Sequence, residues 1–165
     1  MHLLKGYSVD FHYTIIGDGE LKSNIERLIA KYNLNSNVSL LGFQPQDKVN
    51  QLLQNADIFL LPSVTASNGD MEGIPVALME AMAMGLITIS TYHSGIPELI
   101  CDQQNGLLVP EHSPADLAKS LLSLDNGELD IPKMRKAAKL KVEESFEQSK
   151  LYQHLAELLV KVHES

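Results

Sequence analysis

The sequence of 165 residues has a single cysteine, no tryptophan and no long uninterrupted apolar run. Cys101 has no second cysteine for an internal disulfide, and the six histidines show no metal-ligand spacing with it. We therefore expect neither a disulfide framework nor a bound metal. No stretch approaches the roughly 18 consecutive apolar residues of a membrane-spanning helix, so no such helix is predicted.

Basic residues are also scarce, with 13 Lys and Arg against 21 Asp and Glu and a net charge of −8. This balance repels phosphates, so no nucleic acid partner is expected. The basic residues between 133 and 141 are either a solvated helix face or a binding patch, and the solvated face is the commoner case. No secretory signal is found at the start, which favours a cytoplasmic location.

The composition that remains, 44% hydrophobic and 21% charged, is that of an ordinary globular protein. A chain of this length buries enough surface for one core, so we expect a single domain over residues 1–165. Five short apolar runs predict buried strands, and helical periodicities between them cover 21–32, 49–53 and 76–84. The alternation predicts an α/β fold, a Rossmann-like three-layer sandwich with a parallel sheet. The expected strands are 11–16, 38–41, 58–61, 86–90 and 107–109.

The last third of the sequence is predicted to be helical. Ser113 and Pro114 are typical of an N-cap and a first helical position. Two further amphipathic helices are expected over about 132–146 and 149–163, so C-terminal helices occupy the domain from about residue 131 to 165.

A glycine turn, Gly17-Asp18-Gly19, follows the first predicted strand and precedes a helix. Such a turn either binds an anion through free backbone N–H groups or only connects strand and helix tightly. Lys22 stands where the dinucleotide-binding fingerprint has its third glycine, which disfavours a nicotinamide dehydrogenase.

A more specific pattern is the pair Glu72 and Glu80 around a helix start. Pro75 suits the first turn of a helix, which leaves the N–H groups of Val76 and Ala77 unpaired at the positive end of the helix dipole. That arrangement suits a diphosphate. Glu72 lies just outside the helix, within reach of sugar hydroxyls. Glu80 lies in an apolar stretch, either as a ribose-binding carboxylate or as part of an exposed helix face.

The segment E-G-I-P-V-A-L-M-E-A-M-A resembles the signature of retaining family-4 glycosyltransferases, specifically the C-terminal, nucleotide-sugar-binding domain of their GT-B fold. Further matching segments occur in the same order as in the family between about residues 8 and 123. The sequence around Glu72 is most similar to that of transferases of colanic acid and other exopolysaccharide biosynthesis. The matching pieces are Gly17 to Gly19, V-S-L-L-G-F, A-D-I-F-L-L-P-S, S-G-I-P-E-L-I and N-G-L-L-V-P.

The resemblance implies a role for each matching residue. Glu72 is the catalytic candidate and contacts the donor hexose, while Glu80 binds the ribose hydroxyls. Glu98 is either a ligand contact or an acidic first-turn residue. No metal or other cofactor is implied, because a helix N-terminus takes the place of the cation at the diphosphate. The implied donor-binding residues are Gly17, Gly19, Gly42, Phe43, Ser63, Gly73, Ile74, Val76, Ala77 and Glu80.

The sequence departs from the family pattern at its start. The family's C-terminal domain opens with a central strand and a loop bearing an Arg and a Lys, and neither is found here; nor is the N-terminal domain that holds a glycan or lipid-linked acceptor. The strands at 11–16 and 58–61 are then left with unpaired edges. We expect a homo-oligomer or a partner segment to cover them, rather than direct pairing of the two strands or a poorly stable, aggregating fragment.

The sequence is compatible with two functions. The first is a glycosyltransferase domain that binds a nucleoside-diphosphate sugar, with UDP favoured as nucleotide, for retaining hexosyl transfer in polysaccharide synthesis. It would work in the cytoplasm, at or near the inner membrane face, and the isolated chain is expected to be inactive. The alternative is a truncated nucleotide-binding or assembly module without activity of its own.

Overall fold

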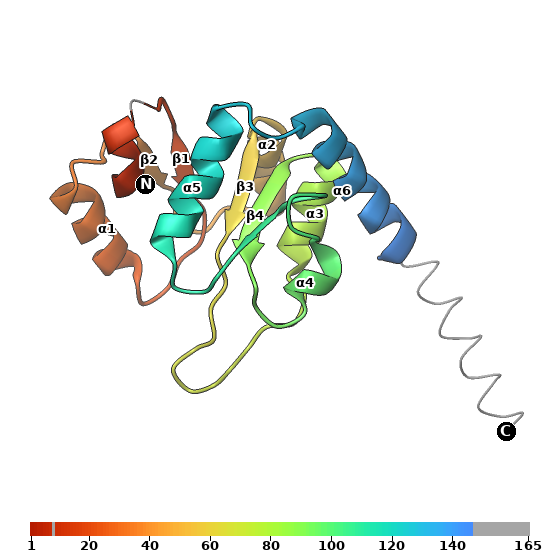
Figure 1. Cartoon of the computed structure of the whole chain (residues 1–165). Helices are drawn as coiled ribbons and strands as arrows, with labels where there is room; N and C mark the ends of the chain where they lie inside the picture. The colour runs from red at the N-terminus through yellow and green to blue at the C-terminus, as the bar shows by residue number, and fades with distance from the viewer. Residues whose placement is uncertain (8, 147–165) are drawn as a thin grey trace, which may run out of the picture.

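Strands and helices alternate along the chain, and the computed structural model describes residues 1–7 and 9–146 (Figure 1). All five predicted strands are present within two residues of their expected bounds: β1 (Tyr13–Ile15), β2 (Val38–Leu40), β3 (Ile58–Leu61), β4 (Ile87–Thr91) and β5 (Leu107–Val109). The helices between and after them are α1 (Lys22–Lys31), α2 (Gln46–Gln54), α3 (Val76–Met84), α4 (Ile96–Leu99), α5 (Pro114–Asp125) and α6 (Ile131–Ser145).

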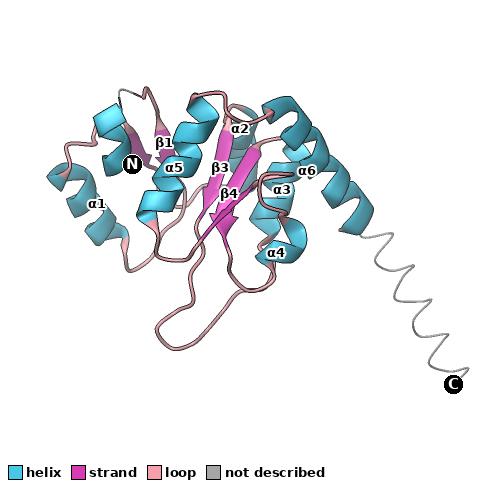
Figure 2. Cartoon of the chain, viewed as in Figure 1, coloured by secondary structure: helices cyan, strands magenta, loops and turns pink. Residues whose placement is uncertain are grey.

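The strands are all parallel but form two separate sheets (Figure 2). In the smaller sheet β1 pairs with β2, with Tyr13 opposite Val38. In the larger sheet the order is β3-β4-β5, with Ile58 opposite Ile87. The α/β class with parallel strands is therefore confirmed.

A gap separates the two sheets between β1 and β3, because no ladder joins these strands in the part of the chain that the structure describes. The alternative in which 11–16 and 58–61 close directly on each other is thus not formed. Helix α5 contacts both β5 and the short 3-10 helix η1 (His2–Tyr7), and so connects the two halves on one face. The facing edges of β1 and β3 have unpaired backbone groups within the described residues.

The larger sheet has helices on both faces, which gives the three layers. On one face its side chains pack with α5 and the start of α6, through Ile87, Ile89 and Leu124. On the other face they pack with α3, α4 and the middle of α6, where Leu78, Met82 and Ile96 are fully buried. The packing fixes α3 against the strand that precedes it.

Helix α3 is apolar nearly all round because it lies between α2, the sheet and α6. It ends at Gly85, whose φ of +82° is the left-handed conformation that glycine adopts without strain. Helix α6 begins after Asp130, whose carboxylate accepts a hydrogen bond from the amide of Lys133 at 3.0 Å.

Two sequence expectations differ from the structure or lie outside it, and one element was not predicted. Ser113 is the N-cap residue of α5, but its hydroxyl donates to the Asp116 carboxylate at 2.6 Å instead of accepting from the helix amides. The 3-10 helix η1 has no counterpart among the predicted elements. The helix expected over 149–163 lies outside the described residues. No helix within the described ranges is long and apolar enough to cross a membrane.

Candidate functional site

The loop of residues 62–75, called here the donor loop, runs from the end of β3 to the start of α3. Its two ends are joined by a hydrogen bond of 2.5 Å from the Ser63 hydroxyl to the Glu72 carboxylate. Glu72 is exposed, and Ser63 is partly buried next to the strand end. The carboxylate proposed to face the donor sugar is therefore held near the carboxyl edge of the larger sheet, where ligands of open α/β sheets bind.

Helix α3 begins directly after this loop. Pro75 has extended backbone angles and is the N-cap residue, one position before the first helical turn where the sequence placed it. The amide of Leu78 bonds to the Pro75 carbonyl at 3.0 Å, so the amides of Val76 and Ala77 are the ones that helical geometry leaves unpaired. Both residues are exposed, which leaves room for an anion at this helix N-terminus.

Glu80 lies one helical turn after Val76, about 6 Å further along the axis and on nearly the same face. Its side chain is partly buried. Among the described residues, none makes a hydrogen bond or ion pair with its carboxylate. This position suits a carboxylate that receives hydrogen bonds from a ligand which also contacts the N-terminus of α3.

The glycine turn lies beside the loop after β2. Gly17, with φ of +133°, donates its amide to the carbonyl of Gly42 at 2.9 Å, and Gly42 itself has φ of +67°. The amide of Gly19 is bonded to the Asp18 carboxylate at 2.9 Å. Two of the turn's N–H groups are therefore already engaged, which favours the interpretation as a connecting turn over that of an anion site. Phe43 follows Gly42 and is 80% exposed.

In the structure, these predicted donor-binding residues lie in two groups. One contains Ser63, Glu72 and the start of α3, and the other contains Gly17, Gly42 and Phe43. No hydrogen bond joins the groups within the described residues. The chain segments that follow β1 and β3 both leave toward the lower edge in Figure 1, so both groups follow carboxyl ends of parallel strands.

The remaining predicted residues have plainer surroundings. Ile74 packs into the core and fills the space that a Cβ on Gly95 would need, with its Cγ1 at 2.9 Å from that position. Gly73 and Glu98 are exposed, and Glu98 is in the first turn of the short helix α4. The structure gives Glu98 no partner within the described ranges, so its first-turn position is the only role the geometry shows.

A polar network that sequence reasoning missed lies behind the donor loop. His93 follows β4, is 1% exposed, and shares a hydrogen bond of 2.7 Å through Nδ1 with the Glu111 carboxylate. Glu111 also accepts from the backbone amide and hydroxyl of Thr65 at 2.9 and 3.3 Å. The Thr65 amide, followed by His93, lowers the pKa of Glu111 below its ordinary value. Both side chains directly follow strand ends, and that position was the available sequence signal.

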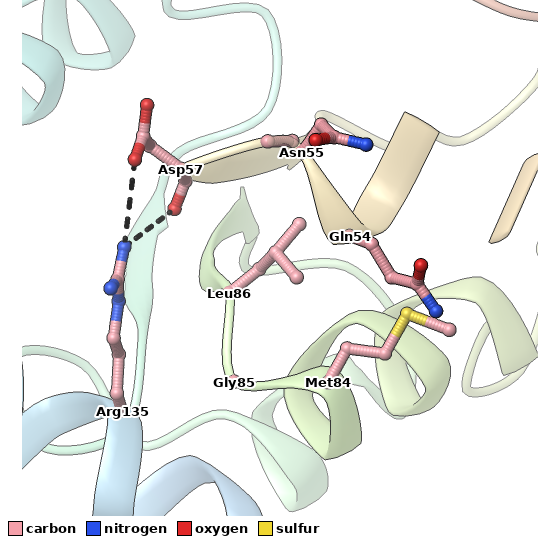
Figure 3. A pocket seen from close by; sticks show the side chains of 8 residues that line it. Gln54, Asn55, Asp57, Met84, Gly85, Leu86 and Arg135 are labelled. Atoms are coloured by element: carbon pink, nitrogen blue, oxygen red, sulfur yellow. Dashed lines mark hydrogen bonds and ion pairs between the residues drawn. The ribbon is translucent and has the colours of Figure 1, made fainter. Parts of the chain in front are cut away.

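A cavity of about 540 Å³ lies at the opposite rim, where β3 and β4 begin (Figure 3). Arg135 of α6 reaches toward Asp57, with 3.4 Å from its guanidinium to the Asp57 carbonyl. The lining is mainly Gln54, Asn55, Gly85 and Leu86. None of the predicted donor-binding residues lines it, so this cavity is separate from the candidate site.

Potential metal ligands do not gather at the site. Within residues 1–7 and 9–146, no three His, Cys, Asp or Glu side chains lie close enough together to hold an ion.

The family model for glycosyl transferases group 1 matches residues 1–142. The chain belongs to the glycosyl transferases group 1 family. It is 51% identical over 157 residues to the amylovoran biosynthesis glycosyltransferase AmsK of Erwinia amylovora, covering 95% of this chain and 39% of AmsK. It is 46% identical over 157 residues to the putative colanic acid biosynthesis glycosyltransferase WcaL of Escherichia coli K12, covering 94% of this chain and 39% of WcaL. The chain thus spans about two-fifths of these relatives.

Solved protein structures share the fold. The chain superposes on Anabaena HepE, solved in complex with UDP-glucose, with a TM-score of 0.75 and 22% identity, over 91% of this chain and 41% of HepE. At this identity the likeness concerns the fold. It confirms the predicted Rossmann-like half of a GT-B fold, and the relatives confirm the predicted kinship with exopolysaccharide glycosyltransferases.

Proposed function

We propose that this chain is the nucleotide-sugar-binding part of a retaining glycosyltransferase that builds an extracellular polysaccharide. The observation that carries the proposal is the geometry around α3. Glu72 is bonded to Ser63 at the strand end, the amides of Val76 and Ala77 are unpaired, and Glu80 follows one turn later. The family membership and the exopolysaccharide names of the relatives support the same reaction class.

In this proposal each group has one task. The N-terminus of α3 binds the diphosphate through the amides of Val76 and Ala77 and through the helix dipole. Glu80 accepts hydrogen bonds from the ribose diol, and Glu72 contacts the donor sugar near its reacting carbon. The loop with Gly42 and Phe43 would meet the nucleobase, largely through backbone atoms, and Gly17 and Gly19 would leave room close to the phosphates. Stabilising the departing diphosphate would lower most of the barrier.

UDP is the nucleotide we favour, supported by the UDP-glucose complex of the fold relative HepE. No metal enters the proposal, because the helix N-terminus neutralises the diphosphate. Titration with UDP in EDTA and in magnesium chloride should therefore give the same affinity.

The proposal also includes a cytoplasmic location near the inner membrane face and an N-terminal partner domain that holds the acceptor.

Chemical shift mapping tests the site. Added UDP should shift the amides of Gly17, Gly42, Ser63 and residues 72–80. The variant Arg135→Ala alters the cavity at the opposite rim and should leave these shifts and the affinity unchanged. Shifts confined to the surroundings of Arg135 would contradict the proposal.

The alternative, a module that binds a partner but has no activity alone, is favoured by one observation. The edges of β1 and β3 that face the gap have unpaired backbone groups in the described part of the chain. We infer that a segment of another chain or a second copy pairs with them. Analytical ultracentrifugation distinguishes these cases, because a monomer at all concentrations contradicts a homo-oligomer. A transfer assay with UDP-glucose then separates an active enzyme from a binding module.

A further inference from the structure

The donor loop is fastened to the larger sheet by hydroxyl groups at its first end. The Ser90 hydroxyl donates to the carbonyl of Leu61 at 2.6 Å, and the Thr91 hydroxyl donates to the carbonyl of Ser63. Ser90 and Thr91 are buried at 0% and 2% exposure, so these bonds form in the interior. The backbone up to Ser63 therefore continues the geometry of the sheet.

At Thr65, the loop is held by a carboxylate. Glu111, which follows β5, accepts both the backbone amide and the hydroxyl of Thr65. The carboxylate is itself held by the ring of His93, whose Nδ1 lies 2.7 Å from it. His112 is the other titratable group near this carboxylate, with Nε2 at 3.9 Å. A chain of contacts thus runs from the end of β4, through the end of β5, to the donor loop.

The turn after β4 also contacts the second end of the donor loop. Gly95 packs so closely on Ile74 that a Cβ there would lie 2.9 Å from the Ile74 Cγ1. Ser94, between His93 and Gly95, has φ of +44°, a strained conformation for a residue other than glycine. The turn of residues 93–95 is therefore shaped to hold Thr65 through His93 and Glu111, and Ile74 through Gly95.

The loop between these two anchors has bonds of its own. The amide of Ala66 bonds to the Asp70 carbonyl at 3.0 Å, and the amide of Gly69 bonds to the Ala66 carbonyl at 2.8 Å. The loop carries Glu72 near its end, where the Ser63 hydroxyl holds the carboxylate. Displacing the loop at Thr65 would shift this part of the chain relative to α3.

We propose that His93 and Glu111 are positioning residues that set the donor loop, and with it Glu72, for the sugar of the bound donor. The inference rests on the proposed function of the site. His93 acts through Glu111 and touches no donor atom. The diphosphate and ribose contacts lie on α3, outside this network, so loss of the anchor should weaken binding of the sugar and spare the nucleotide.

The test compares His93→Leu and Glu111→Ala with wild type in titrations with UDP and with UDP-glucose. A lost hydrogen bond to a charged group costs about tenfold, so UDP-glucose should bind about tenfold more weakly while UDP changes by less than about twofold. His93→Asn places an amide donor near the Nδ1 position and should restore most of the loss; His93→Gln should not. Glu128→Ala removes an exposed carboxylate that accepts from Asn126, away from the loop, and is the matched control.

Amide hydrogen exchange without any ligand tests the anchoring of the donor loop separately from donor binding. Exchange at Ala66 and Gly69 should accelerate in His93→Leu and Glu111→Ala but not in Glu128→Ala. Unchanged exchange in both variants would overturn the inference, whatever the chain binds. If wild type bound neither UDP nor UDP-glucose, the proposed function would fall and the donor role of these residues with it. Equal losses for UDP and UDP-glucose would indicate a general structural role and would also overturn the inference.

Discussion

Replacing Glu80 by alanine should lower the affinity for the nucleotide without destabilising the fold. No described residue donates a hydrogen bond to the Glu80 carboxylate, so the substitution breaks no internal bond. Alanine is also a stronger helix former than glutamate, which leaves α3 intact. The effect of the change should therefore appear in ligand binding alone.

The size of the loss follows from the position of the carboxylate. Glu80 lies one turn, about 6 Å, beyond the unpaired amide of Val76, which suits a ligand whose diphosphate binds at the helix start and whose ribose lies alongside. Hydrogen bonds to a charged acceptor contribute about 1.5 to 3 kcal/mol. UDP should then bind about 10- to 150-fold more weakly to Glu80→Ala.

Glu72→Ala is the comparison variant. Glu72 is exposed in the donor loop and is expected to contact only the sugar. Its replacement should weaken UDP-glucose and leave UDP unchanged. Isothermal titration calorimetry of both variants with both ligands measures the four affinities. Equal losses of UDP affinity in the two variants, or no loss in Glu80→Ala, would refute the assignment of ribose and sugar to separate carboxylates.

Three predictions concern stability. Leu78→Ala, at a fully buried position, should lower the free energy of unfolding by about 2 to 5 kcal/mol, while Leu140→Ala, at a position 43% exposed, should lower it far less; urea denaturation measures both. Gly85→Ala should destabilise by about 1 kcal/mol because alanine is strained at a φ of +82° and because its Cβ would lie 2.6 Å from the Lys139 Cε, which has to move. Gly85→Asn should cost less because asparagine tolerates that conformation; equal losses would show that the contact with Lys139, and not the conformation, decides the loss. The pKa of Glu111 in the folded chain lies below the ordinary 4.5, so ionised Glu111 stabilises the fold fully above pH 4.5, and this stabilisation is lost as the pH falls through the lower folded pKa. Urea denaturation between about pH 6 and 3 should therefore show that the free energy of unfolding declines less steeply in Glu111→Gln than in wild type.

The sequence predicts most of the fold because its signals are local. Each strand lies within a short, mainly apolar run, and each run lies one helix away from the next, although only β4 and β5 are buried along their whole length. Helix α3 could be placed to the residue because its apolar stretch lies between Pro75 and Gly85. The strand bounds were less sharp, since hydrogen-bonded pairing with a neighbour decides where a strand ends.

The candidate site was predicted in part. The residues of the Glu72 to Glu80 segment follow one another in the chain, so their placement around one helix start could be inferred. The contacts of Gly17 with Gly42, and of His93 with Glu111, join residues that are 25 and 18 positions apart. Such contacts depend on which strands are neighbours, and periodicity does not determine that order.

The gap between the sheets has a consequence for how the chain unfolds. The larger sheet and its helices contain all three clusters of buried apolar residues, whereas the segment with β1, α1 and β2 contributes few buried side chains, among them Leu34 and Val38. A two-stranded unit with so little core is only marginally stable by itself. The amides of β1 and β2 should therefore open to solvent at a much lower free energy than those of β4, which makes the chain two cooperative units of unequal stability.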